Sequence, residues 1–119
     1  MSRSVAQLLT RARQLLQDQA SEAYRYPTED LVDALNDGFM ETYRLRPDIF
    51  IGTFGDELPD IPIDLNDYTE VLYPLPAFTF TALVDFVVGR VAARDDEGQN
   101  ESRASAFLAS FTQKLLGSA

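Results

Sequence analysis

The sequence predicts a mainly α-helical fold, a small antiparallel four-helix bundle with a long proline-rich insertion between the second and third helices. Four segments repeat apolar residues at steps of three and four, the spacing of one helix face. Four of the six prolines fall between positions 47 and 74. The 119 residues suit one domain, and helices of this length are not stable alone in water. We therefore expect residues 1–119 to pack as a single helical domain.

The first two helices are predicted over about residues 4–19 and about residues 29–45. Ser4 and Thr28 have side chains that suit the N-caps of the first and second helix. Gly38 costs about 1 kcal/mol relative to alanine inside a helix, so we expect another backbone to approach it closely. The polar residues that fall largely off the apolar stripe of the first helix are Arg3, Arg11, Arg13, Gln14 and Gln17.

Residues 47–75 form a long excursion between the second and third helices. We expect two or three short extended pieces, and a short β-hairpin is one arrangement of them. The prolines favour edge strands or irregular backbone over a central sheet. Connections of this length in a compact domain are usually functional or mobile.

The third helix is predicted over about residues 76–95, with Pro76 in its first turn, and it should be the most buried helix. The fourth is predicted over about 101–116 and ends at Gly117. The aromatic residues at helical spacing, which we expect in the core, are Phe39, Phe78, Phe86, Phe107 and Phe111.

The composition excludes several classes of enzyme. The chain contains no cysteine and no histidine, so it has neither a thiol nucleophile nor the usual general base and zinc ligand. Its net charge of −9 opposes nucleic-acid binding through phosphate contacts, which requires a basic face. We expect no enzymatic activity, no catalytic residue and no cofactor.

The acidic residues are concentrated in the middle of the chain, because residues 47–89 carry eight of them and no Lys or Arg. Carboxylates can hold Ca²⁺ or Mg²⁺, but the spacing here matches no ligand loop. We interpret these acids as solvated turns and expect no metal site. The residues considered as ligands are Asp56, Glu57, Asp60, Asp64 and Asp67.

Two further groups of side chains leave alternatives open. Phe50, Phe54 and Tyr68 lie on the excursion, where large apolar side chains suggest burial against a partner, although they could instead fold back over the helices. Four arginines could pair with acids of the middle segment, in the same chain or in a neighbouring copy. The alternative is ordinary surface ion pairs worth under about 1 kcal/mol each. These arginines, the candidate contacts between copies, are Arg44, Arg46, Arg90 and Arg94.

The sequence shows no sign of membrane insertion. No apolar run reaches the roughly 18–20 residues that a membrane-spanning helix needs. The first residues lack the apolar core and cleavage pattern of a secretory signal. We therefore expect a soluble, intracellular protein without a membrane partner.

Three stretches of the sequence resemble a known family. They are LLTRARQLLQD at 8–18, YPTEDLVDALNDG at 26–38 continuing to YRLRPD at 43–48, and AFTFTALVDFVVGR at 77–90 followed by Asp95-Asp96-Glu97. Together they resemble the head-to-tail connector proteins of tailed bacteriophages, also called adaptor or head-completion proteins. The resemblance covers most of the chain, and the excursion is its least matched part.

The resemblance implies a structural virion protein that is assembled in the host cytoplasm and located at the head–tail junction. Such proteins form a homo-oligomeric ring, commonly of twelve copies, beneath the portal protein. A loop reaches toward the downstream tail or nozzle protein, the C-terminal end often reaches into the portal, and DNA passes through the lumen without specific binding. An acidic wall would repel phosphates and let DNA slide. The implied partner-binding residues are Ile49, Phe50, Ile51, Phe54, Asp56, Glu57, Asp60, Leu115 and Leu116.

Two other functions are compatible with parts of the sequence. A small acidic interaction module outside any ring, such as an inhibitor that imitates DNA or an antitoxin-like protein, would explain the charge of −9 equally well. It predicts a stable monomer or dimer, so the oligomeric state separates it from a connector. A hydrolase based on two carboxylates would need a pocket that places the two acids at catalytic separation.

Overall fold

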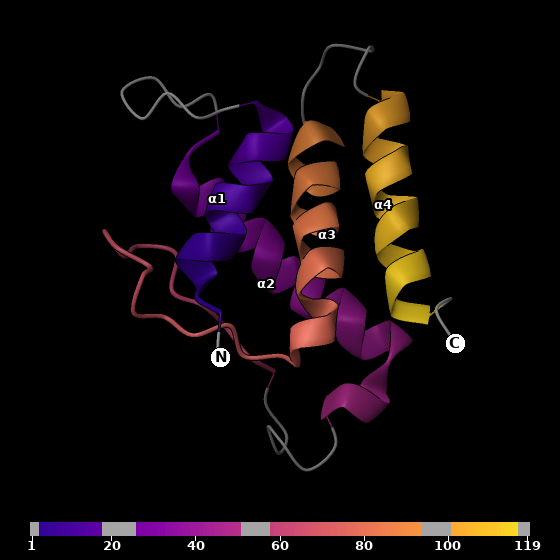
Figure 1. Cartoon of the computed structure of the whole chain (residues 1–119), viewed down its shortest axis with the longest axis horizontal. Helices are drawn as coiled ribbons and strands as arrows, with labels where there is room; N and C mark the ends of the chain where they lie inside the picture. The colour runs from indigo at the N-terminus through magenta and orange to yellow at the C-terminus, as the bar shows by residue number, and fades with distance from the viewer. Residues whose placement is uncertain (1–2, 18–25, 51–57, 94–100, 117–119) are drawn as a thin grey trace.

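The computed structural model describes residues 3–17, 26–50, 58–93 and 101–116, without the side chains of 101–103. The predicted mainly helical fold is confirmed, with four α-helices and two short 3₁₀ helices in this part of the chain (Figure 1). The radius of gyration of 14.0 Å is close to the roughly 13.5 Å expected for a compact chain of this length. In chain order the elements are α1 (Val5–Leu16), α2 (Thr28–Leu45), η2 (Pro47–Phe50), η3 (Ala77–Thr79), α3 (Phe80–Ala93) and α4 (Glu101–Leu116).

Helix α3 occupies the centre of the molecule, with α1 on one side and α4 on the other, and α2 crosses behind α3 to end near the end of α4 (Figure 1). Helix α3 contacts all three helices and is buried along almost its whole length, so the prediction that the third helix is the most buried is confirmed. A helix that is apolar on every side can be stable only when its neighbours surround it. The side chains of α1 and α2 that pack inward, such as Leu8 and Leu35, are those of the predicted stripes.

The beginning of α1 is capped as the sequence predicts. The Ser4 hydroxyl accepts a hydrogen bond from the Gln7 amide at 3.2 Å, and the Gln7 side chain accepts one from the Ser4 amide at 2.9 Å. The helix ends at Leu16, earlier than predicted, because Gln17 turns into the left-handed region with φ 58°. The left-handed residue directs the chain away from the helix axis.

Thr28 does not cap α2, so that prediction is wrong. Thr28 is the first residue of the helix, and its hydroxyl accepts a hydrogen bond from Arg13 Nη2 at 3.0 Å. Arg13 Nη1 also donates to the Tyr26 carbonyl at 2.9 Å, so this largely buried guanidinium joins α1 to the start of α2. The Thr28 hydroxyl therefore stabilises the contact between α1 and α2 and does not cap the end of α2.

Two glycines allow close packing on α3. A Cβ at Gly38 would lie 2.7 Å from Leu83 Cδ1 and 3.0 Å from the Phe86 ring, so side chains approach Gly38 and not the predicted backbone. At Gly89 a Cβ would lie 2.8 Å from Leu108 Cγ and 3.1 Å from the carbonyl oxygen of Ala104. Gly89 is therefore the position where the backbones of α3 and α4 come close.

Helix α3 is preceded by η3, so the predicted helix start at Pro76 is wrong by one short turn. In η3 the inward position belongs to Thr79, whose hydroxyl is 2.6 Å from the Tyr73 hydroxyl in a buried hydrogen bond. Phe78 points outward and is 58% exposed, which corrects its assignment to the core. The 3₁₀ winding shifts the helical register on which that assignment depended.

Residues 58–75 pack over the helices instead of projecting from them. The side-chain amide of Asn36 on α2 accepts from the Ile61 amide at 2.8 Å and donates to the Ile61 carbonyl at 2.9 Å. Further along, the Tyr73 amide donates to the Arg3 carbonyl and the Val5 amide to the Val71 carbonyl, both at 2.8 Å. No strand forms within 47–50 or 58–75, where an isolated antiparallel bridge between Ser4 and Leu72 is the β-pairing present.

Candidate partner-binding surface

Arg46 joins three elements at the end of the molecule where α2 and α4 finish. Its Nη1 donates to the Leu115 carbonyl of α4 at 2.7 Å, while Nε and Nη2 bind the Asp48 carboxylate at 2.9 and 2.8 Å. The hydrogen bond from Arg46 lowers the pKa of Asp48 below its ordinary value. We use the name α2–α4 end for this region, where Arg46 joins Asp48 and Leu115 and where Tyr43 contacts Phe50. The residues of α2, η2 and α4 considered with it are Met40, Tyr43, Arg46, Asp48, Ile49, Phe50, Leu115 and Leu116.

The α2–α4 end brings together four of the predicted partner-binding residues, but they are not equally accessible. Phe50 and Leu115 are buried within their own chain, Ile49 is half-buried, and Leu116 is 47% exposed. The Phe50 ring packs edge-on against Tyr43, with 5.4 Å between the ring centroids. Of the two interpretations of Phe50, this structure therefore shows the ring folded back, and its contact with a partner stays a prediction.

Tyr43 is the aromatic residue of this surface that the sequence reasoning did not single out. It is 48% exposed, and Met40, one turn earlier on α2, is 60% exposed. Both residues lie off the apolar stripe of α2, on the face that normally carries polar side chains. Large apolar residues on that face are the signal that could have identified this surface from the sequence.

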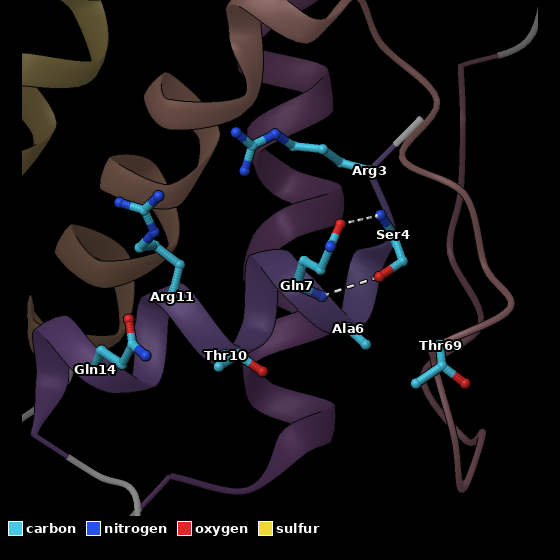
Figure 2. Close-up of a pocket in the computed structure, with 8 residues that line it drawn as sticks. All are labelled: Arg3, Ser4, Ala6, Gln7, Thr10, Arg11, Gln14 and Thr69. Atoms are coloured by element: carbon cyan, nitrogen blue, oxygen red, sulfur yellow. Dashed lines mark hydrogen bonds between the residues drawn. The ribbon is translucent and has the colours of Figure 1, made fainter. Parts of the chain in front are cut away.

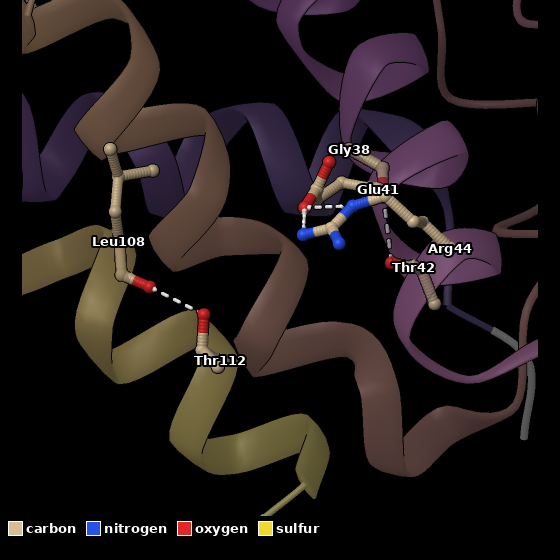
Figure 3. A network of polar contacts seen from close by, with 6 residues as sticks. All are labelled: Gly38, Glu41, Thr42, Arg44, Leu108 and Thr112. Carbon is tan, nitrogen blue, oxygen red and sulfur yellow. Dashed lines mark hydrogen bonds and ion pairs between the residues drawn. The ribbon is translucent and has the colours of Figure 1, made fainter.

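Arg44 and Arg90 pair within the chain with acids of α2, so the structure shows the ordinary surface ion pairs of the second alternative, and their contact with a neighbouring copy stays a prediction. Arg44 binds Glu41, one turn earlier on the exposed side of α2 (Figure 3). Arg90 of α3 binds Asp37 at 3.0 Å. Arg46 with Asp48 follows the expectation within one chain, and Arg94 lies outside the described residues.

Two threonine hydroxyls near this end donate hydrogen bonds to carbonyls of their own helices. Thr42 is fully buried and donates to the Gly38 carbonyl at 2.7 Å, and Thr112 donates to the Leu108 carbonyl at 3.2 Å (Figure 3). This hydrogen bond satisfies the buried Thr42 hydroxyl, whereas Thr112 is exposed on α4.

The acidic residues that the structure describes on the excursion are exposed. Asp60, Asp64 and Glu70 face solvent, and Asp67 accepts hydrogen bonds from the amide and hydroxyl of Thr69, which lower its pKa. Within the described ranges, no group of three or more side chains could hold a metal ion. Tyr68 folds back, with its hydroxyl donating to the Pro62 carbonyl at 2.6 Å. The remaining predicted partner residues, Ile51, Phe54, Asp56 and Glu57, lie outside the described part of the chain.

A second feature is an open pocket of about 530 Å³ on the face of α1 (Figure 2). Its lining combines polar and apolar groups and contains two arginines and no acidic residue. The Arg3 guanidinium lies 4.5 Å from the centroid of the Phe80 ring. The lining residues used below are Arg3, Gln7, Thr10, Arg11, Gln14 and Thr69.

Comparison with known protein families, curated proteins and solved structures finds no match. None of the described helices is both long and apolar enough to cross a membrane.

Proposed function

We propose that this chain is a structural connector of a tailed-bacteriophage virion, without enzymatic activity. Copies would form a ring, for which twelve is the expected number, beneath the portal protein and would join it to the downstream tail or nozzle protein. The four helices would form an antiparallel bundle in each copy. The bundle is supported by α3 and α4, which lie side by side and are joined by a short connection, as is typical of antiparallel neighbours (Figure 1).

The observation that carries this proposal is the exposed apolar surface of the α2–α4 end. Tyr43 and Met40 on α2 and Leu116 on α4 each expose a large apolar side chain. Apolar patches favour contact with another protein, and the proposal requires that these three side chains contribute to one such patch. Arg46 fixes the underlying elements, so the surface is already formed before a partner binds. The exposed Leu116 side chain at the end of α4, beside the junction that Arg46 holds, suits docking to the portal.

The exposed acids of residues 58–70 support the passage of DNA. A lumen wall that carries carboxylates repels phosphates and keeps DNA from adhering. Residues 58–75 contribute four such acids and no basic residue, since Asp60, Asp64, Asp67 and Glu70 are all exposed. Its packing against α1 and α2 would hold these charges in fixed positions.

The test is docking of the chain to the portal protein of the same phage, followed by cryo-electron microscopy of the complex. The wild type should appear as a ring under the portal. A variant with Tyr43→Ser and Leu116→Ser should dock about tenfold more weakly and keep its helical circular dichroism, because both side chains are exposed. The matched control is Leu72→Ser, which removes a similarly exposed side chain from the excursion.

Absence of any ring would contradict the connector. A stable monomer or dimer would favour the acidic interaction module instead, a candidate that the four exposed acids of residues 58–70 also support. Binding of that monomer to a basic protein, lost on reversal of Asp60 and Asp64, would then assign the acids to an inhibitory or antitoxin-like role.

A further inference from the structure

The arginines of the α1 pocket, Arg3 and Arg11, differ in their partners from four other cations that the structure describes. Arg44, Arg46, Arg90 and Lys114 each pair with a carboxylate. Arg3 and Arg11, in contrast, form no ion pair with any residue in the described ranges. A chain with a net charge of −9 thus keeps two arginines without an acidic partner in one open pocket.

The pocket also offers neutral hydrogen-bond donors beside these arginines. Gln7, Arg11 and Gln14 follow one another at steps of four and three, so they share one face of α1 (Figure 2). The Gln7 side-chain oxygen is used by the Ser4 amide, which leaves its NH₂ group available as a donor. Guanidinium and amide donors in this arrangement suit the oxygens of a carboxylate or a phosphate.

The complementary feature is the acidic stretch 60–64 of the excursion. Asp60 and Asp64 are exposed and form no ion pair with the described residues. The Asn36 amide holds the backbone between them at Ile61, so the carboxylates are presented from an ordered segment. Among the described residues, the chain therefore exposes two arginines in one pocket and two carboxylates on one anchored stretch, and none of these four groups has an ion-pair partner there.

We infer that the α1 pocket binds the acidic stretch 60–64 of a second copy of this chain. The inference rests on the proposed function, because it supplies the contact between neighbours in the ring. Two different surfaces of each copy meet, and such a head-to-tail contact closes into a ring when the rotation between copies permits it. The charge of −9 disfavours nucleic acid as the occupant, because a dense polyanion would have to approach an acidic molecule.

The test combines charge-reversed chains and measures self-association by sedimentation at low salt. Arg11→Glu and the pair Asp60→Arg with Asp64→Arg should each weaken self-association about tenfold or more when studied alone. Mixing the two variants should restore it, because every contact in an alternating assembly is again between opposite charges. The control for net charge compares two variants that each carry one negative charge more than the wild type. Ser105→Glu, at an exposed position of α4, should associate like the wild type. Arg11→Gln should associate more weakly, because it removes a charge from the pocket.

The outcomes separate this inference from the proposed function. If the wild type and the charge-reversed variants assemble equally well, the pocket contact is wrong and the proposed connector function is unaffected. Wild type that stays monomeric both alone and with the portal overturns both. Binding of a labelled oligonucleotide that is lost in Arg11→Glu, with self-association intact, overturns the contact and assigns the pocket to phosphates. Circular dichroism of each variant confirms that the comparison is between folded chains.

Discussion

Tyr73 is a buried phenol whose environment favours the neutral form. Burial raises the pKa of Tyr73 well above its ordinary value near 10, while the hydrogen bond with Thr79 lowers it to a smaller extent. The ring lies between Phe39 and Phe80, with centroids at 6.3 and 5.3 Å. Ionisation would place a negative charge in this apolar site, so alkaline pH destabilises the folded state.

We predict that the contribution of Tyr73 to stability is fully present below about pH 10 and is lost as the pH rises further, because the folded-state pKa lies above the unfolded one. Tyr73→Phe should lower the free energy of unfolding by about 1 kcal/mol at pH 7 and make its decline above pH 10 shallower. Thr79 would keep its bond to the Pro76 carbonyl. Urea unfolding from pH 7 to 11 measures this; equal alkaline slopes in both chains would refute it. Exposed Tyr43→Phe is the control.

Asp85 is a buried carboxylate that joins α3 to α4. Its Oδ2 accepts from the Ser110 hydroxyl and from Lys114 Nζ, both at 2.7 Å. We predict that Asp85→Ala lowers the free energy of unfolding by about 2–3 kcal/mol, since a buried network loses its central acceptor.

A double-mutant cycle of Asp85→Ala with Lys114→Met should give a coupling energy above about 1 kcal/mol. The same cycle on the exposed pair of Arg44 and Glu41 should give less than about 0.5 kcal/mol. Equal couplings would show that burial of Asp85 is irrelevant.

At the scale of elements, the local sequence pattern predicts where the helices lie but predicts their ends only in part. Apolar periodicity predicts all four helices, and the Ser4 capping box needs only residues within one turn. The Thr28 cap could not be predicted correctly, because its hydroxyl is bonded to Arg13, a residue on another helix. The position of Phe78 differs from the prediction for a similar reason, since Thr79 takes the inward position of η3 and bonds to Tyr73, which lies outside any local helical pattern.

The packing of α3 against α4 depends on Gly89. We predict that Gly89→Ala lowers the free energy of unfolding by about 1–3 kcal/mol, because the new methyl group meets Leu108 and the Ala104 backbone. Gly38→Ala should cost less, because the groups near it are side-chain atoms of Leu83 and Phe86, which can shift, whereas the Ala104 backbone near Gly89 cannot. The gain of about 1 kcal/mol in helix propensity applies to both positions. Thermal and urea unfolding of the two variants measure which substitution lowers the free energy of unfolding more. A more stable Gly89→Ala chain would show that α3 and α4 do not approach as closely as described.

At the scale of the whole molecule, the sequence predicts that residues 47–75 are distinct but not where they lie. Composition alone marks the prolines and acids of this segment. Its attachment depends on pairs far apart in the chain, such as Asn36 with Ile61 and Arg3 with Tyr73, which no local pattern specifies. The same limit applies to the candidate site, because Arg46 meets Leu115 only after α2 and α4 have packed together.

The attachment of the excursion implies that residues 58–75 unfold together with the helices. The amides of Val5 and Tyr73 bond across the contact between excursion and α1, so they can exchange with solvent only when this contact opens. We predict that both exchange hydrogen at rates similar to those of the core amides of α3, as measured by NMR. Asn36→Ala should release the Ile61 backbone and speed exchange at Tyr73 about tenfold while α3 stays protected, because the lost pair of hydrogen bonds contributes about 1–2 kcal/mol. Rapid exchange of the Tyr73 amide in the wild type would contradict this and would make the excursion an independently moving arm.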